Sequence, residues 1–133
     1  MSATTVEITQ QNFQSLVDRD GIVLIDWWAQ WCGPCRAFAP TYELVAAKHP
    51  DITFGKVNTE VEQALAGTFE IRSIPTLMLL RDKVLLFSQA GALPESGLED
   101  LIRQVRALDM DTVRARIASR QQEKQQEKKS DTP

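Results

Sequence analysis

The chain has 133 residues, a length that fits one domain able to bury a hydrophobic core without disulfide staples or metal. Its composition, 43% hydrophobic and 25% charged, is that of an ordinary soluble globular protein. A formal charge of −3 at pH 7 gives no electrostatic reason for binding nucleic acid or an anionic membrane, so we expect neither partner.

The sequence also predicts no export or membrane segment. Residues 1–7 lack the basic and apolar regions of a secretory signal. No apolar run approaches the roughly 20 residues needed to span a bilayer. We therefore expect a cytoplasmic, reducing compartment, where a lone pair of cysteines is more often catalytic or metal-binding than structural.

The first part of the chain predicts a strand, a helix and a second strand. Apolar and polar residues alternate over residues 5–8, which favours a short edge strand. Thr9 can then cap a helix over residues 10–19. The run from Ile22 to Trp28 is almost entirely apolar, as expected of a strand buried on both faces of a sheet.

A long helix and a parallel strand are predicted next. Apolar residues recur at helical spacing from Ala37 to Ala47, so a helix should run to about His49 with Pro40 inside it. Residues 52–58 indicate a strand. Two strands joined by a helical crossover should pair in parallel, with a right-handed connection.

The next segments predict a short helix, a hairpin and a longer helix. The short helix covers residues 61–68, and residues 76–80 and 84–89 are joined so briefly that they should form a hairpin. Gly91 follows as a bulge or a close-approach site. The longer helix starts near Pro94 and turns four apolar residues inward: Leu98, Leu101, Ile102 and Val105.

The composition changes after Leu108, which predicts a domain over residues 1–108 and a charged extension over 109–133. Residues 120–133 include no large apolar side chain, so this part cannot bury enough surface to offset its ordering entropy. We expect a marginal helix over residues 112–118 and a solvated remainder. The charges of the extension fit a solvated helix face better than a partner-binding arm, although both interpretations stay open.

The two cysteines, Cys32 and Cys35, stand where the apolar strand passes into the long helix. A helix N-terminus presents free N–H groups and the positive end of the macrodipole, so it favours an anion, and Cys32 gains most as a thiolate. Tetrahedral zinc needs four ligands, and one histidine with no further cysteine cannot supply them in one chain. A redox dithiol is therefore predicted, with a metal site shared across a dimer as the residual alternative.

The positions of the two thiols predict their roles. Cys32 should be the exposed nucleophile that attacks a partner's disulfide, and Cys35, one turn deeper, should resolve the mixed disulfide. Resolution needs Cys35 deprotonated, and Asp26 is the candidate acceptor. A carboxyl inside an apolar strand has a raised pKa, which suits a general base near neutral pH. The other interpretation is a solvent-facing acid.

Two separated motifs carry a resemblance to a known family. The first is Trp31-Cys32-Gly33-Pro34-Cys35 behind a strand with an internal acid, and the second is Arg72-Ser73-Ile74-Pro75-Thr76. Together they resemble the thioredoxin family, from about Val6 to about Leu108.

The resemblance implies a thioredoxin fold of the α/β class, with a mixed sheet of about five strands flanked by about four helices. It also implies a monomeric protein-disulfide reductase without a bound cofactor that maintains cytosolic protein thiols and is re-reduced by a thioredoxin reductase. The pair Gly33-Pro34 matches the strongly reducing members of the superfamily.

The same resemblance implies roles for further residues. Asp26 matches the buried acid that lies behind the second cysteine and acts through water, and Lys56 matches a lysine whose ammonium approaches that acid. The bond between Ile74 and Pro75 should be cis and face the cysteines, leaving the Ile74 backbone free to pair with an extended partner segment. The implied substrate surface comprises Trp31, Gly33, Pro34, Ile74, Pro75, Gly91 and Ala92.

Several residues depart from the family pattern or take a structural interpretation. Glu70 stands where a positive φ would be strained, and Lys83 replaces a hairpin glycine, which suggests a different turn type. We expect Trp27 in the core, Trp28 packed beneath the active-site loop and His49 at the surface without a catalytic role.

Two other functions stay open. The first is a thioredoxin-fold interaction module that contacts partners through the C-terminal extension. The second is an oxidase or isomerase, which a reduction potential well above the cytosolic poise would indicate.

Overall fold

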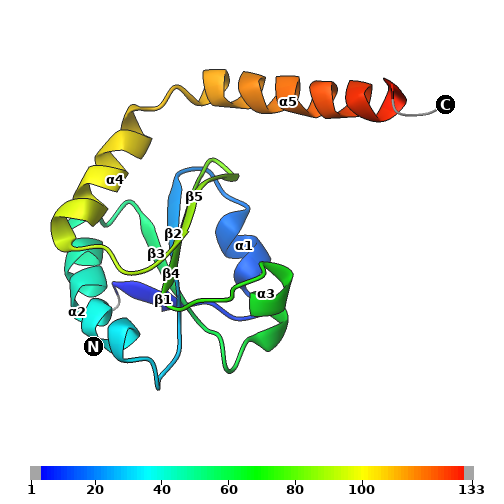
Figure 1. The fold of residues 1–133 in the computed structure, drawn as a ribbon. Coiled ribbons are helices and arrows are strands. Elements are labelled where there is room, and N and C mark those ends of the chain that lie inside the picture. Colours follow the sequence, from blue (N-terminus) through cyan, green and yellow to red (C-terminus); the bar gives the residue numbers. More distant parts are fainter. Residues whose placement is uncertain (1–3, 131–133) are drawn as a thin grey trace.

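The computed structural model describes residues 4–130 and contains one five-stranded sheet with strand order β1-β3-β2-β4-β5 (Figure 1). The first three strands of the chain run parallel to one another. The fourth strand pairs antiparallel with the second, and the fifth pairs antiparallel with the fourth, so the predicted mixed sheet is confirmed. The strands are β1 (Thr5–Glu7), β2 (Ile22–Trp28), β3 (Thr53–Asn58), β4 (Thr76–Arg81) and β5 (Val84–Ala90).

Four helices flank the sheet, two on each face (Figure 1). On one face α2 (Gly33–Lys48) and α4 (Glu95–Ala107) bury their apolar side chains against the strands. On the other face α1 (Phe13–Val17) and α3 (Gln63–Thr68) cover a second cluster. A further helix, α5 (Met110–Ser130), continues beyond the sheet.

Strand β2 lies at the centre of the sheet and explains why its sequence is apolar throughout. Leu24 packs into the cluster under α2 and α4, whereas Val23 and Ile25 pack into the cluster under α1 and α3. Trp27 is fully buried in that second cluster, as predicted. Since both faces of β2 are covered, the strand carries Asp26 and the cysteines that follow it on a rigid support.

Two short helices begin later than predicted. The helix expected over residues 10–19 is only α1, because Thr9 and Asn12 hold a turn before it: Thr9 N donates to Asn12 Oδ1 at 2.7 Å and Asn12 N donates to Thr9 Oγ1 at 3.3 Å. The helix expected from residue 61 starts at Gln63. Before it, Val61 N and Glu62 N both donate to Asn58 O, and these two hydrogen bonds form a turn.

The longer helix of the domain follows the prediction. Leu98, Ile102 and Val105 are buried, and Leu101 packs partly against the same cluster.

The C-terminal extension differs more strongly from the prediction, because α5 is helical from Met110 to Ser130 instead of over residues 112–118. Glutamine, glutamate, lysine, arginine and alanine dominate it, and all are good helix formers. Asp109 supports its start, since Asp109 Oδ1 accepts from Asp111 N at 3.1 Å. Residues 118–126 are exposed, as expected of a solvated segment.

Polar contacts hold the junction between α4 and α5 to the β4–β5 hairpin. Arg81 Nη1 donates to Val105 O at 2.7 Å and to Leu108 O at 2.9 Å, which satisfies carbonyls at the end of α4. The Arg114 guanidinium lies 3.8 Å from Asp82 Oδ2, and Met110 is buried. The start of α5 is therefore fixed to the domain.

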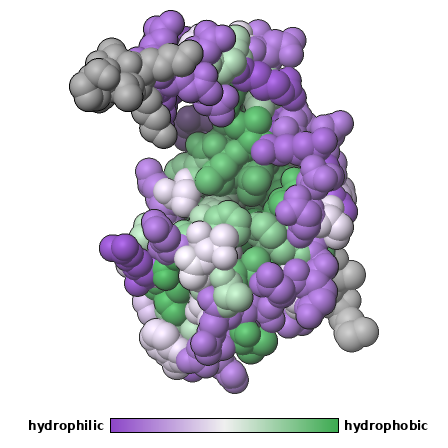
Figure 2. Space-filling view, turned by 90° about the vertical axis from the view of Figure 1, so that its right-hand side faces the viewer, coloured by the Kyte–Doolittle hydropathy of each residue, from purple (hydrophilic) through white to green (hydrophobic). Residues whose placement is uncertain are grey.

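Helix α5 leaves the domain at the end opposite the start of α2 (Figure 1). In the space-filling view its hydrophilic side chains lie over a hollowed, more hydrophobic part of the surface (Figure 2). None of the described helices is long and apolar enough to span a bilayer.

Among residues 4–130, three residues other than glycine adopt a positive φ. Glu70 has φ 53°, a backbone conformation that is strained for a residue other than glycine. Asp82 and Lys83 have φ 51° and 73°, the pattern of a type I′ turn, although such turns favour glycine. Asp82 stabilises the turn, because its Oδ1 accepts from Gly21 N at 2.8 Å.

Candidate active site

The cysteine pair lies at the first turn of α2. Cys32 is the N-cap residue, with φ −83° and ψ 110°, and its Sγ accepts from Cys35 N at 3.2 Å. Pro34 occupies the first turn, where its missing N–H costs nothing. A disulfide joins Cys32 to Cys35, whose Cα atoms are 5.2 Å apart. The predicted position at a strand-to-helix junction is confirmed.

The exposure predicted for Cys32 is wrong for this disulfide form. Cys32 is only 4% exposed, compared with 2% for Cys35. Both pack with Ala29 against Trp28 and Ile74, so the expectation that Trp28 lies under the active-site loop is confirmed. The contact with Ile74 crosses 42 residues of sequence, which is why the sequence did not reveal it.

The loop that faces the dithiol contains a cis peptide bond between Ile74 and Pro75, as predicted. Ile74 O lies 3.7 Å from Cys32 Sγ. Pro75 O accepts from Gly91 N at 2.7 Å, and the φ of Gly91, 106°, is one that favours glycine. The predicted close approach is wrong, because nothing lies within 4 Å of the position that a Gly91 Cβ would take. The bulge of this hairpin lies instead at residues 79–80.

The other residues of the predicted substrate surface are exposed. Trp31 is 65% exposed, and Gly33, Pro34 and Ala92 are exposed as well. Trp31, Gly33 and Pro34 therefore border the buried Cys32 on the side of α2, whereas the cis-proline loop borders it on the side of β4. No contact places Ala92 against the dithiol.

Asp26 is buried in β2, so the interpretation of a solvent-facing acid is wrong. The residue is 1% exposed, and neither carboxyl oxygen accepts a hydrogen bond from the residues that the structure describes. Burial raises the pKa of Asp26 to about 7, although the charge of Lys56 acts in the opposite direction. The carboxyl can therefore gain or lose a proton near neutral pH.

Lys56 is the register partner of Asp26 on β3 and is half-buried. Its Nζ lies 4.9 Å from the centre of the Trp28 ring, a cation–π contact. The ammonium therefore influences Asp26 through its charge while Trp28 holds it in place.

Tyr42 is a polar residue on the face of α2 that the sequence predicts to be apolar. It is fully buried, and its hydroxyl donates to Gly55 O at 2.8 Å. Burial, followed by the charge of Asp26, raises the pKa of Tyr42 well above its usual value. A hydroxyl on the same helix face as Cys35 was the only sequence signal of this contact.

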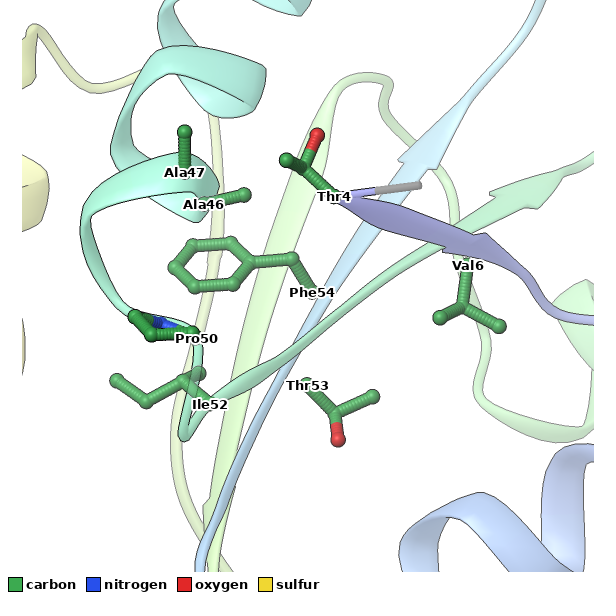
Figure 3. Close-up of a pocket in the computed structure, with 8 residues that line it drawn as sticks. All are labelled: Thr4, Val6, Ala46, Ala47, Pro50, Ile52, Thr53 and Phe54. Atoms are coloured by element: carbon green, nitrogen blue, oxygen red, sulfur yellow. The ribbon is translucent and has the colours of Figure 1, made fainter. Parts of the chain in front are cut away.

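A pocket at the other end of α2 lacks groups for redox chemistry (Figure 3). Its volume is about 320 Å³, and no titratable side chain lines it. The lining residues are Thr4, Val6, Ala46, Ala47, Pro50, Ile52, Thr53 and Phe54. No group of three or more potential metal ligands occurs among the side chains of residues 4–126.

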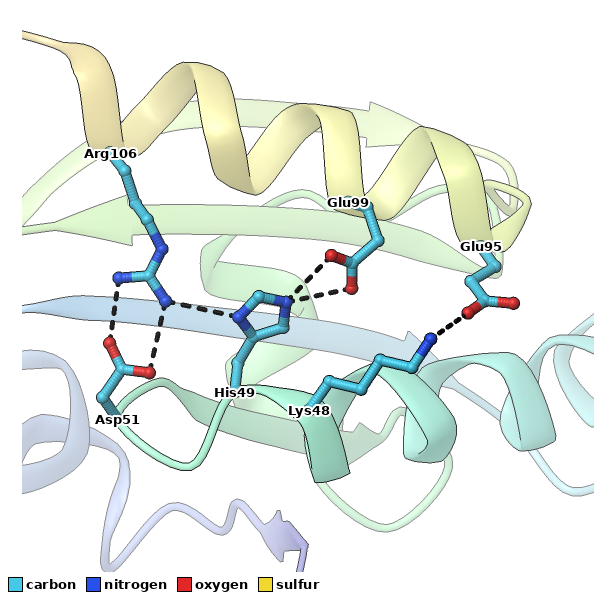
Figure 4. A network of polar contacts seen from close by, with 6 residues as sticks. All are labelled: Lys48, His49, Asp51, Glu95, Glu99 and Arg106. Carbon is cyan, nitrogen blue, oxygen red and sulfur yellow. Dashed lines mark hydrogen bonds and ion pairs between the residues drawn. The ribbon is translucent and has the colours of Figure 1, made fainter.

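A polar network joins the end of α2 to α4 (Figure 4). His49 is not a plain surface residue, because α4 covers it: His49 Nε2 lies 2.9 Å from a Glu99 carboxylate oxygen, and its side chain is only 18% exposed. Arg106 Nη2 lies 3.3 Å from His49 Nδ1, so the neutral tautomer with hydrogen on Nε2 satisfies both contacts. Lys48 pairs with Glu95 and Arg106 with Asp51, so the network stabilises the packing of α4 against the end of α2 and the turn after it.

Comparison with known proteins identifies the family. The thioredoxin family model matches residues 4–104, about three quarters of the chain. The chain belongs to the thioredoxin family. It is a thioredoxin, a thiol-disulfide oxidoreductase with a redox-active Cys32–Cys35 disulfide. Members of this family reduce disulfide substrates and generally have a reductase as partner.

Individual thioredoxins are similar over most of their length. The chain is 53% identical to a putative thioredoxin 2 of Streptomyces coelicolor over 118 residues, which cover 89% of this chain and 88% of that one. It is 39% identical to a thioredoxin of Chlamydia pneumoniae over 97 residues, which cover 73% and 94%. A 118-residue match leaves at most about 15 residues of this thioredoxin uncovered, so the similarity to the Streptomyces protein reaches into α5.

Proposed function

We propose that this thioredoxin acts in the cytoplasm as a general reductant of protein disulfides, with Cys32 as the attacking thiol and Cys35 as the resolving thiol. The observation that carries the assignment is the position of Cys32 Sγ at the N-cap of α2, 3.2 Å from Cys35 N. In the reduced protein this N–H and the helix macrodipole favour a Cys32 thiolate, which is the reactive species in thiol-disulfide exchange.

The first step is attack on the substrate. The Cys32 thiolate bonds to one sulfur of the substrate disulfide, and the other substrate sulfur leaves as a thiolate that takes up a proton. The product is a mixed disulfide between Cys32 and the substrate.

The second step closes the Cys32–Cys35 disulfide. Asp26, in its ionised form, takes the thiol proton of Cys35 through water, and the Cys35 sulfur bonds to Cys32. The bond from Cys32 to the substrate breaks, and its electron pair stays on the substrate sulfur. A carboxyl whose pKa is about 7 suits this transfer, and Lys56 keeps enough of it ionised near neutral pH.

The substrate docks on the surface around the dithiol. An extended segment pairs with the backbone of Ile74 beside the cis Pro75, in the manner of an added strand. Its side chains contact the exposed groups of the substrate surface, namely Trp31, Gly33, Pro34, Gly91 and Ala92. A thioredoxin reductase then restores the dithiol, the monomer needs no bound cofactor, and neither nucleic acid nor a membrane takes part.

Trapping tests the assignment of the two thiols. Cys35→Ser should accumulate mixed disulfides with substrate proteins that disappear on non-reducing gels after dithiothreitol, because Cys32 attacks and nothing resolves the product. Cys32→Ser is the matched control and should trap nothing. Equal trapping by both variants would reject the order of attack, and partners that bind without any mixed disulfide would indicate an interaction module.

Two further measurements sharpen the assignment. Alkylation of Cys32 should titrate well below the usual pKa of a thiol, about 8.5. The reduction potential should lie near or below the cytosolic glutathione poise, whereas a value well above it would indicate an oxidase or isomerase.

A further inference from the structure

Lys56 has a carboxyl group opposite it on each neighbouring strand. Its register partner on β2 is Asp26, and its register partner on β1 is the exposed Glu7. Cross-strand partners share one face of a sheet, and neighbouring strands lie only about 4.8 Å apart. The flexible four-carbon stem of a lysine can span this separation, so the register favours an ion pair with one of the two carboxylates.

The structure shows a different arrangement. None of the ion pairs between the described residues involves Lys56, and neither Asp26 oxygen accepts a hydrogen bond from them. The ammonium lies instead over the Trp28 ring, with Nζ 4.9 Å from the ring centre. This neighbour is a diagonal one, because Trp28 pairs with Asn58, two positions beyond Lys56. The lysine therefore takes an aromatic partner although two carboxyls stand opposite it.

Trp28 is a fixed support for the ammonium. Its side chain packs against the cluster that contains both cysteines. Its carbonyl accepts from Thr59 N at 2.8 Å and from Thr59 Oγ1 at 3.1 Å. On the ring the half-buried Lys56 stays near the surface, whereas a pair with Asp26, which is 1% exposed, would remove the ammonium from water.

We propose that Trp28 is a positioning residue for Lys56: its ring holds the ammonium beside Asp26 and keeps it from forming a direct ion pair there. The carboxyl then feels a positive charge but gains no ion-pair partner, so it can still accept a proton. A direct ion pair would hold Asp26 as a carboxylate and make it a weaker base. This inference rests on the role proposed for Asp26 above.

Few other groups act on Asp26. Its neighbour on β4, Leu77, is apolar. On α2, burial raises the pKa of Tyr42 well above its usual value, so its hydroxyl stays neutral. Cys35 does not titrate in the disulfide form. In that form the Asp26 titration therefore reports where the Lys56 ammonium lies.

The first test is the Asp26 titration in Trp28→Leu, followed by carboxyl ¹³C NMR on the full chain in its disulfide form. Without the ring the ammonium should move to the carboxylate and lower the midpoint by about half a unit to one unit. Trp31→Leu is the matched control, because it makes the same change at an exposed ring that the ammonium does not cover, and it should leave the midpoint in place. A fall smaller than about 0.3 unit in Trp28→Leu, or a rise, would overturn the proposal.

A second background separates movement of the ammonium from entry of water. Loss of a large ring could hydrate Asp26 and lower its pKa without any part played by Lys56. Trp28→Leu should therefore leave the midpoint unchanged when it is combined with Lys56→Met, because no ammonium remains to move. An equal fall in both backgrounds would reject the proposal. Trp28→Phe keeps a smaller aromatic face and replaces the leucine variant if that variant does not fold; its smaller fall should also vanish with Lys56→Met.

The third test uses the parent protein. The ring current of an indole shifts protons above its face upfield, so the methylene protons next to the Lys56 ammonium should resonate upfield of those of the other lysines. This shift should vanish in Trp28→Leu and remain in Trp31→Leu. A Lys56 signal at the ordinary lysine position in the parent protein would show that the ammonium leaves the ring in solution, and the proposal would fall.

The proposal and the role of Asp26 can fail separately. If Asp26→Asn slows resolution while Trp28→Leu leaves the Asp26 midpoint unchanged, the base stands and the positioning by Trp28 falls. If the midpoint falls in Trp28→Leu but Asp26→Asn resolves mixed disulfides at the normal rate, the positioning stands without the base.

Discussion

The two ends of this thioredoxin domain are built in opposite ways. At the dithiol end the chemically important groups are buried and have few polar partners: Cys32 packs against apolar side chains, and the Asp26 carboxyl accepts no hydrogen bond from the described residues. At the end where α4 meets α5, Arg81 donates to backbone carbonyls and Arg114 pairs with Asp82 at the surface.

This difference separates reactivity from anchoring. A buried carboxyl without donors is costly to ionise, but its pKa lies where a proton can be exchanged at neutral pH. A satisfied surface network stabilises a helix and offers no nucleophile. Substitutions at the dithiol end should therefore change activity and its pH dependence, whereas substitutions at the α5 end should change stability alone.

The largest expected effect is at Asp26, where Asp26→Asn should stabilise the protein. The folded-state pKa of Asp26, about 7, lies above the ordinary value of 3.8, so the unfolded chain binds fewer protons between these values. Stability then falls as the pH rises from about 4 to about 7 and levels off above. The full difference in the free energy of unfolding corresponds to about 4 kcal/mol, and at pH 8 Asp26→Asn should be more stable than the parent by this amount.

Urea unfolding at pH 4 and pH 8 measures this effect, and resolution of a mixed disulfide should slow in the same variant. Leu24→Val, a core change nearby in the same strand, is the control and should shift stability equally at both pH values. An Asp26→Asn protein that is no more stable than the parent at pH 8 would show that the carboxyl finds hydrogen-bond donors in solution.

Arg81→Ala should have the next largest effect, at the opposite end. The change removes a charged donor from the carbonyls of Val105 and Leu108, and we expect a loss of about 2 kcal/mol. Disulfide reduction should continue at the parent rate in conditions where the variant is folded. Arg81→Lys, which keeps the charge but not the fork of donors, should recover part of the stability. A loss of activity without a loss of stability would break the separation of the two ends.

Lys56→Met should move the pH dependence of resolution without changing the fold. The charge of Lys56 lowers the pKa of Asp26, so its removal should raise that pKa by roughly one unit and shift the lower limb of the pH profile to higher pH. Stopped-flow measurement of resolution from pH 5 to pH 9 tests this. Lys56→Arg keeps the charge and should leave the profile in place, and a profile that moves equally in both variants would point to lost contact with Trp28 instead.

Arg114→Ala should have the smallest effect. Its ion pairs with Asp82 and Asp111 are partly exposed, and such pairs contribute less than about 0.5 kcal/mol. Thermal unfolding should shift by no more than a few degrees, and reductase activity should stay the same. A markedly larger loss would mean that α5 and the hairpin form one cooperative unit.

The fold could be predicted from local patterns because each pattern had one physical meaning. The apolar run of β2 required a strand covered on both faces, and the two motifs around Cys32 and Pro75 matched one family. The buried position of Asp26 followed from an acid within that run. All of these signals lie within a few neighbouring residues.

The features that the sequence did not reveal depend on distant contacts or on backbone propensity. Cys32 is buried by Ile74, and the Tyr42 hydroxyl finds Gly55 on another element. The length of α5 was underestimated because the prediction relied on hydrophobic burial, whereas strong helix formers and the Asp109 cap extend this helix. The turn at Asp82 and Lys83 is supported by a contact with Gly21, which lies 61 residues away in the sequence.

The direction of α5 makes the protein suitable for immobilisation. The helix leaves from the end of the domain opposite the start of α2, so a resin or electrode coupled through an affinity tag after the C-terminus would sit away from the cysteines (Figure 1). Bound in this orientation, every molecule on the support would present its dithiol to the solution. Such a matrix could capture client proteins from a mixture and be regenerated by a simple reducing wash.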